Sequence, residues 1–187
     1  MNEKDMCHLM IDMETYGVSS NAVFRSIAGV LFNLEGKNKE LFNYGIDLED
    51  SLMHGLVIDQ ETINFWRNES EKNRKNLMLL PKNPLNEILW SIKNLIRQEV
   101  KDYSLIYMWS HGSSFDIVLL ENAYKAMGEK AWWKYSKVRD TRTLFDVANY
   151  KYKAKGGHDA LEDTKNQVVA VCEAYQLIKE GKINGNH

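Results

Sequence analysis

Short apolar runs that precede a series of amphipathic helical patterns constrain the fold of this chain more than any other feature. The run from His8 to Asp12 is too short for a helix and predicts a buried strand. Residues 22–34 and 40–48 are rich in the β-branched and aromatic residues that are typical of strands, and Gly36 with its polar neighbours predicts a hairpin loop between them. The sequence therefore predicts a sheet that opens with an antiparallel three-stranded meander.

Helical patterns occupy most of the remaining sequence. The clearest one follows Pro84, where apolar residues recur at spacings of three and four from Leu85 to Ile96. The other predicted elements are a strand over residues 105–109 and helices over residues 59–70, 116–127, 143–148 and 159–181. This order predicts an α/β fold with a mixed central sheet. Because the sequence shows no internal repeat and no second domain, we expect residues 1–187 to form one domain.

The composition excludes several classes of function. The chain has 24 Lys and Arg residues against 26 Asp and Glu residues, a net charge of −2, so no uniformly basic surface can hold nucleic acid by charge alone. Such a partner would require a local basic segment or metal ions. Cys7 and Cys172 are far apart, which argues against a disulfide framework and against a cysteine-rich zinc site. Since neither a signal peptide nor an apolar run of roughly 20 residues is present, we expect a cytoplasmic protein without a membrane contact.

Two acidic residues follow an apolar strand directly, where a site is a possible reason for them. Motifs for a phosphate loop, a dinucleotide site, a zinc protease and a serine hydrolase are all missing from the sequence. Asp12 and Glu14 lie two residues apart at the end of an apolar strand, so both carboxylates face the same side of the sheet. If buried, two such anions repel each other unless a cation binds or a pKa rises. The alternative is that the strand simply ends in water.

Two further acids and one histidine stand near predicted helix starts. Asp116 follows Ser113 in a capping-box pattern, and Asp163 lies in the first turn of the last helix, which Asp159 opens in a second such pattern. Helix capping and the helix dipole alone explain both positions, so a purely structural role stays open. His158 follows Gly156 and Gly157 in a loop, where a histidine is usually solvated. Beside an acidic cluster, however, its ordinary pKa near 6.5 suits proton abstraction from water.

Taken together, these five residues resemble the DEDDh superfamily of 3′–5′ exonucleases. The three motifs of that family are D-x-E at a strand end, F-D after a turn of small residues, and H-x-x-x-x-D at the start of the final helix, and the resemblance covers about residues 8–178. Residues 11–15, 58–66 and 139–144 are similar to a phage and bacterial branch of exodeoxyribonuclease VIII and exoribonuclease-like proteins. The chain departs from these relatives at His111, where they often carry Asn, and at Arg25, in a strand that is usually apolar.

The resemblance implies a ribonuclease H-like fold and a metal-dependent 3′–5′ exonuclease that releases nucleoside 5′-monophosphates from DNA or RNA. It implies that Asp12, Glu14 and Asp163 hold one divalent ion, that Asp12 bridges to a second, and that Asp116 binds metal directly or through water. His158 would be the general base. Mg²⁺ and Mn²⁺ prefer such carboxylate oxygens, and the lack of a Cys/His set argues against zinc. A homodimer is compatible with the resemblance.

Candidate substrate-binding residues adjoin these positions. Met13 and Thr15 neighbour the expected metal ligands, Phe115 precedes Asp116, and Trp66 either borders the groove or fills the core. In addition, residues 134–155 carry seven basic and two acidic side chains, a local charge of +5, and include Arg142. The basic residues are Lys134, Lys137, Arg139, Arg142, Lys151, Lys153 and Lys155, and the interleaved aromatic ones are Trp132, Trp133, Tyr135, Tyr150 and Tyr152. This segment predicts a surface for a single strand, and the alternative is a solvated loop whose aromatic residues belong to the core.

Two other functions remain open at the level of sequence. The same chemistry could act on dinucleotides or very short oligomers, or the chain could be a catalytically idle nucleic-acid-binding module that has kept the fold. DNA and RNA substrates cannot be told apart, because recognition of the 2′-hydroxyl depends on pocket geometry rather than on a motif.

Overall fold

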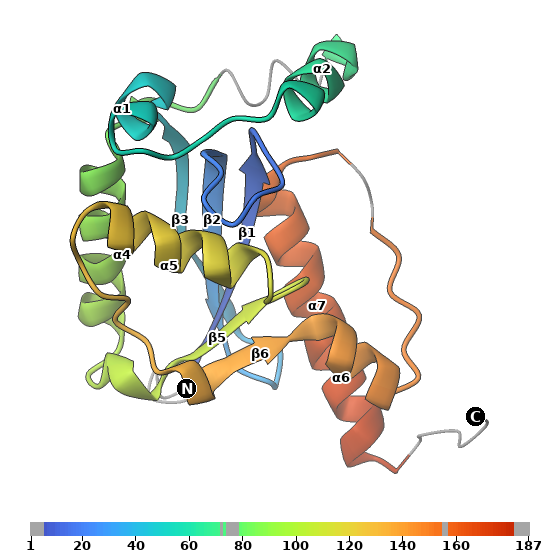
Figure 1. The fold of residues 1–187 in the computed structure, drawn as a ribbon. Coiled ribbons are helices and arrows are strands. Elements are labelled where there is room, and N and C mark those ends of the chain that lie inside the picture. Colours follow the sequence, from blue (N-terminus) through green and yellow to red (C-terminus); the bar gives the residue numbers. More distant parts are fainter. Residues whose placement is uncertain (1–5, 72, 74–78, 155–156, 182–187) are drawn as a thin grey trace.

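The computed structural model of the protein describes residues 6–71, 73, 79–154 and 157–181, and a mixed sheet forms its centre (Figure 1). Within these residues the sheet has six strands in the order β4-β3-β2-β1-β5-β6. The strands are β1 (His8–Thr15), β2 (Phe24–Phe32), β3 (Asn38–Ile46), β4 (Lys82–Asn83), β5 (Tyr107–Ser110) and β6 (Val138–Asp140). The helices are α1 (Leu48–Met53), α2 (Gln60–Asn68), α4 (Leu85–Glu99), α5 (Asp116–Ala126), α6 (Thr141–Val147) and α7 (Ala160–Lys179). Single 3₁₀ turns span Tyr103–Leu105 and Tyr135–Lys137.

The antiparallel meander predicted from the sequence is confirmed. β1 pairs with β2 in antiparallel register, and β2 pairs with β3 in the same way. On the other side of β1 the sheet becomes parallel, because β5 runs alongside β1 and β6 runs alongside β5. The predicted α/β class with a mixed central sheet is therefore also confirmed.

The differences between prediction and structure concern short elements. β4, β6 and α1 were not predicted, since segments of two, three and six residues are too short to show a period. The strand predicted over residues 105–109 begins later, at Tyr107. Its first residue instead ends a 3₁₀ turn that begins where the side chain of Asp102 accepts a hydrogen bond from the N–H of Ser104, at 3.0 Å.

Helices cover both faces of the sheet, and the period of two in β1 divides its side chains between them. Leu9 and Ile11 belong to the core beneath α4 and α5, whereas Met10 belongs to the second core, beneath α6 and α7. Asp12 and Glu14 continue the row of Met10, so they point toward the face that α7 covers. Within the described part of the chain, every helix is too short or too polar to cross a lipid bilayer.

Candidate metal centre and adjoining cleft

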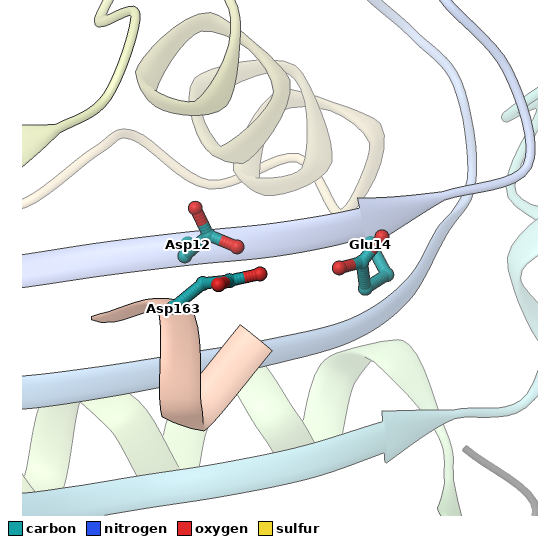
Figure 2. Close-up of side chains that lie close together, drawn as sticks. All are labelled: Asp12, Glu14 and Asp163. Atoms are coloured by element: carbon teal, nitrogen blue, oxygen red, sulfur yellow. The ribbon is translucent and has the colours of Figure 1, made fainter. Parts of the chain in front are cut away.

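Three carboxylates converge where the end of β1 meets the first turn of α7 (Figure 2). One oxygen each from Asp12, Glu14 and Asp163 lies within 4.8 Å of the other two. Asp159 fixes the start of α7 as the sequence predicts, because its carboxylate accepts hydrogen bonds from the N–H groups of Leu161 and Glu162, at 3.1 and 3.2 Å. A helix that begins at this point presents Asp163 to the two acids of β1.

Gln167, one helical turn beyond Asp163, completes the surroundings of Asp12. Its side chain is buried, and its Nε2 donates a hydrogen bond to Oδ1 of Asp12 at 2.8 Å. Its Oε1 has no hydrogen-bond partner among the described residues. The sequence motifs do not include this residue, and a glutamine within a helix is by itself no signal of a site.

Burial raises the pKa values of all three acids, and nearby carboxylates add to its effect. Burial is the larger cause for Asp12, whose pKa lies well above its ordinary value, and nearby carboxylates add to it. Burial and the charge of Asp163 raise the pKa of Glu14 to about 8, and burial also raises the pKa of Asp163. Such a group of acids must bind protons or a cation near neutral pH. Because the donors are carboxylate oxygens, the set fits a hard divalent ion.

Asp116 lies beside this cluster without being one of its three members. It is buried at the start of α5, and burial raises its pKa to about 7. Its charge is the second-largest cause of the raised pKa of Asp12, so the two carboxylates interact. The capping box predicted for Ser113 and Asp116 is wrong: the N-cap of α5 is Phe115, without a side-chain hydrogen bond, and the N–H of Ser113 donates to Oδ2 of Asp140 instead, at 2.5 Å.

His158 reaches the cluster from the loop before α7. Its Nδ1 is 3.8 Å from Oε2 of Glu14, and its side chain is 44% exposed. His158 adopts a φ of 48°, in the left-handed region that few side chains favour, and Gly157 before it has a φ of 132°. Gly156 lies outside the described residues. The structure therefore brings all five motif residues to one place, three as a cluster and two beside it.

A cleft of about 390 Å³ opens next to Glu14 between β1 and α2. Three of the expected substrate-binding residues, Met13, Thr15 and Trp66, line it. Trp66 is also a structural residue, because its indole N–H donates to the carbonyl of Thr15 at 2.7 Å. Phe115 does not line this cleft and instead packs against the core beneath α4 and α5. The remaining lining residues are Val18, Asp59, Glu61, Thr62 and Phe65.

The two departures from the family pattern have local explanations. Arg25 is buried with its guanidinium 4.6 Å from the ring centroid of Trp66, and its charge lowers the pKa of Glu14 against the effect of burial. His111 lies 2.7 Å from the hydroxyl of Thr141 through Nδ1. Arg25 therefore packs against Trp66 in the wall of the cleft, and its positive charge partly neutralises the carboxylate of Glu14.

The basic segment divides between core and surface. Trp133 is buried, and Tyr150 and Tyr152 pack against the core beneath α6 and α7, so the alternative of core aromatics holds for these three. Tyr135 is 90% exposed. Arg142 lies near enough to Asp116 for its charge to lower the pKa of that carboxyl. Lys155 lies outside the described residues.

Comparison with known proteins identifies the family. The family model described as the 3′–5′ exoribonuclease Rv2179c-like domain matches residues 7–175. The chain belongs to this family. No curated protein matches the sequence.

The solved structures that this chain resembles include exonuclease I and Pop2p, with which it shares the ribonuclease H-like fold. E. coli exonuclease I in complex with a dA16 oligonucleotide superposes with a TM-score of 0.64 at 10% identity, over 92% of this chain and 42% of that chain. The Mg²⁺- and Mn²⁺-bound form of S. pombe Pop2p gives a TM-score of 0.56 at 14% identity, over 95% of this chain and 86% of that one. The chain thus spans about two fifths of the length of exonuclease I. At these identities the likeness establishes the fold, which is the one that the motifs implied.

Proposed function

We propose that this protein is a metal-dependent 3′–5′ exonuclease that releases nucleoside 5′-monophosphates one at a time from the 3′ end of DNA or RNA. The observation that carries the proposal is the convergence of Asp12, Glu14 and Asp163, three partly or fully buried carboxylates, of which Glu14 also lines a cleft of about 390 Å³. The family supports the direction of cleavage, since the domain that matches is described as a 3′–5′ exoribonuclease.

Asp12, Glu14 and Asp163 would hold one of two Mg²⁺ or Mn²⁺ ions, with Asp12 shared between the two and Asp116 acting directly or through water. The Mg²⁺- and Mn²⁺-bound state of the Pop2p structure supports these ions. When bound, two divalent ions lower the pKa of the attacking water and neutralise charge on the phosphate. The carboxylates themselves orient the ions and give up their protons on binding them.

His158 is the proposed general base. Its Nδ1 faces Glu14, on the side of the imidazole nearer to the carboxylate cluster, so this nitrogen is the one placed to accept a proton from the water. A positioned base of this type contributes roughly 100- to 10,000-fold to a rate. Glycine at position 157 allows the backbone turn that aims His158 at the cluster.

The cleft beside Glu14 is the proposed place for the 3′-terminal nucleoside. Met13 and Trp66 provide apolar surface for the base or sugar, and the hydroxyl of Thr15 can accept a hydrogen bond while it donates to the carbonyl of Gly17. Arg142, beside Asp116, would contact the phosphate backbone. The complex of exonuclease I with dA16 supports a single-stranded substrate.

The decisive experiment compares Asp12→Asn with Asp146→Asn, an exposed aspartate of α6. Matched DNA and RNA oligonucleotides with a 3′ label are incubated with Mg²⁺ or Mn²⁺, and released mononucleotides are separated by chromatography. We expect Asp12→Asn to abolish release with an unchanged circular dichroism spectrum, and Asp146→Asn to behave as wild type. Unchanged activity of Asp12→Asn would sink the proposal. Rates on a dinucleotide and on a long oligomer separate the exonuclease from a dinucleotide hydrolase, and metal-independent binding without cleavage would indicate an idle module.

A further inference from the structure

The imidazole of His158 lies between two carboxylates, of which the proposed mechanism uses one. Nδ1 is 3.8 Å from Oε2 of Glu14, and Nε2 is 3.8 Å from Oε1 of Glu69, the C-cap residue that follows α2. At this separation neither contact is a hydrogen bond, and each carboxylate acts on the imidazole through its electrostatic field. Neither the motifs nor the family resemblance points to Glu69.

Glu69 is itself held in place. The Asn73 side-chain amide donates to its Oε2 at 2.7 Å, and the N–H of Ser70 donates to the same oxygen at 3.2 Å. The Asn73 hydrogen bond is the largest cause that lowers the pKa of Glu69, and the hydrogen bond from Ser70 and the charge of His158 act in the same direction. The oxygen that faces His158, Oε1, is left free of these two bonds.

Two aromatic side chains of α2 also pack against the imidazole of His158. The rings of Phe65 and Trp66 meet the His158 ring edge-on, at centroid distances of 5.2 and 5.6 Å and interplanar angles of 85° and 81°. Edge-on pairs of this kind restrict the orientation of a ring. One element, α2, therefore supplies both the walls around His158 and the anion at its outer nitrogen.

The two carboxylates act differently on the imidazole. The charge of Glu14 would be balanced by the cation that it is proposed to hold, whereas the charge of Glu69 has no such partner in the proposed mechanism. The side of the ring that faces Glu69 is therefore the more favourable place for the imidazole N–H, which leaves the lone pair on Nδ1. A carboxylate that selects the tautomer of a histidine in this way is a recurrent device in active sites.

We propose that Glu69 is a positioning residue for His158: its carboxylate holds the proton on Nε2 and so presents the Nδ1 lone pair to the metal cluster. This role rests on the proposed function. Glu69 does not line the cleft, so it acts on the rate and not on substrate affinity.

The first test compares kcat and KM of Glu69→Ala, Glu69→Gln and the control Glu87→Gln, an exposed glutamate at the start of α4. We expect Glu69→Ala to lower kcat about tenfold or more and to leave KM unchanged. The loss is smaller than the full effect of a general base, because His158 is still present but less well oriented. Glu69→Gln keeps the size of the side chain but removes its charge, so it should lower kcat to a similar extent. A wild-type kcat in Glu69→Ala, or a loss seen only in KM, would overturn the proposal.

The second test reads the tautomer without catalysis. Long-range ¹H–¹⁵N spectra at a pH where imidazole is neutral distinguish protonated from bare ring nitrogens, and a His158→Asn spectrum assigns the signals. We expect the proton of His158 on Nε2 in the wild type and a mixture of tautomers in Glu69→Ala. A wild type with the proton on Nδ1 would contradict the proposal. Wild-type protein that cleaves no phosphodiester would instead overturn the proposed function, so the two failures are distinguishable.

Discussion

At the scale of single residues, one neighbour of Asp12 favours its charged form against all the others. Burial and the surrounding carboxylates favour its protonated form, and the hydrogen bond from Gln167 favours the charged form. That bond occupies Oδ1 at 2.8 Å and leaves the second oxygen for a cation. Gln167 thus holds the Asp12 carboxylate in one orientation and favours its charged form. Hydrogen-bond partners of metal-binding carboxylates commonly act in this way.

Replacing Gln167 by Leu should therefore weaken metal binding without unfolding the protein. The variant loses the donor to Asp12 while it keeps the volume of a buried side chain, and loss of such a partner typically costs about 10- to 100-fold in metal affinity. Isothermal titration with Mn²⁺ measures the effect.

The control for this change is Gln176→Leu, two turns further along α7, where Nε2 donates to the carbonyl of Leu34 at 3.3 Å. It should bind Mn²⁺ as wild type does. Equal affinity in Gln167→Leu and Gln176→Leu would show that the Asp12 hydrogen bond has no role in holding metal.

The candidate site was predictable where a residue type at a fixed spacing carries the chemistry. Asp12 and Glu14 were predictable from the period of two in a strand. His158 was predictable from its place just before a capped helix, and Asp163 from its place in the first turn of that helix. Gln167 and Glu69 were not predictable in this way, because a neutral amide on a helix and a glutamate at a helix end are common in any protein. Only the packing of α7 and α2 against the end of β1 reveals them.

At the scale of elements, Asp140 joins two segments that are far apart in sequence. It ends β6, and its Oδ1 accepts from the N–H of Arg142 at 2.8 Å, which caps α6. Its Oδ2 accepts from the N–H of Ser113, in the turn that leads to Asp116 and α5. One carboxylate therefore anchors the turns that place both Asp116 and Arg142.

Removing this carboxylate in Asp140→Ala should destabilise the protein by about 1–2 kcal/mol, the upper part of the range for a helix cap, because two backbone N–H groups lose their acceptor. Urea denaturation measures the change. The control Asp146→Ala removes an exposed aspartate of α6 that is not its N-cap and should cost less than about 0.5 kcal/mol. Equal losses in the two variants would contradict the anchoring role.

The fold predicted from the sequence is correct for the long elements and incomplete for the short ones, because a period is visible only in a long run of residues. The runs that became β1, β2, β3, α4 and α7 carry enough residues to show a period. β6 has three residues and is defined by its pairing with β5 rather than by its own pattern. The capping box expected at Ser113 did not form because Asp140, 27 residues later, takes its N–H, and such a long-range competitor is invisible in a local pattern.

At the scale of the whole molecule, the net charge is close to zero but the charges are unevenly distributed. The formal charge of −2 includes the four carboxylates at the proposed metal centre, and two divalent ions would shift the total to −2 + 4 = +2. The basic residues near Arg142 lie beside this acidic centre in the sequence. At the acidic centre itself, a nucleic acid would thus meet positive charge only once metal is bound, which couples substrate binding at this place to metal binding.

The same carboxylates predict how the stability of the metal-free protein depends on pH. Burial raises the pKa values of Glu14 and Asp116 to about 8 and 7, above their ordinary values of 4.5 and 3.8. The folded state therefore binds more protons than the unfolded state up to about pH 8, so stability must fall as pH rises through this range. His8 acts in the opposite direction, since burial lowers its pKa to about 4, but its effect is complete above its ordinary value of 6.5.

The window from pH 6.5 to 8 therefore isolates the metal centre. In a chelator, we expect the free energy of unfolding to fall across this window by at most about 1.4 kcal/mol per pH unit for each acid that stays protonated in the folded state. Mg²⁺ or Mn²⁺ should remove the fall, because the cation replaces the protons, and should raise the melting temperature more at pH 8 than at pH 6.5. Asp12→Asn, which lacks one anion of the cluster, should show a shallower pH dependence and little stabilisation by metal. A metal-free wild type that grows more stable between pH 6.5 and 8 would mean that these acids are already ionised, and that the cluster requires no cation.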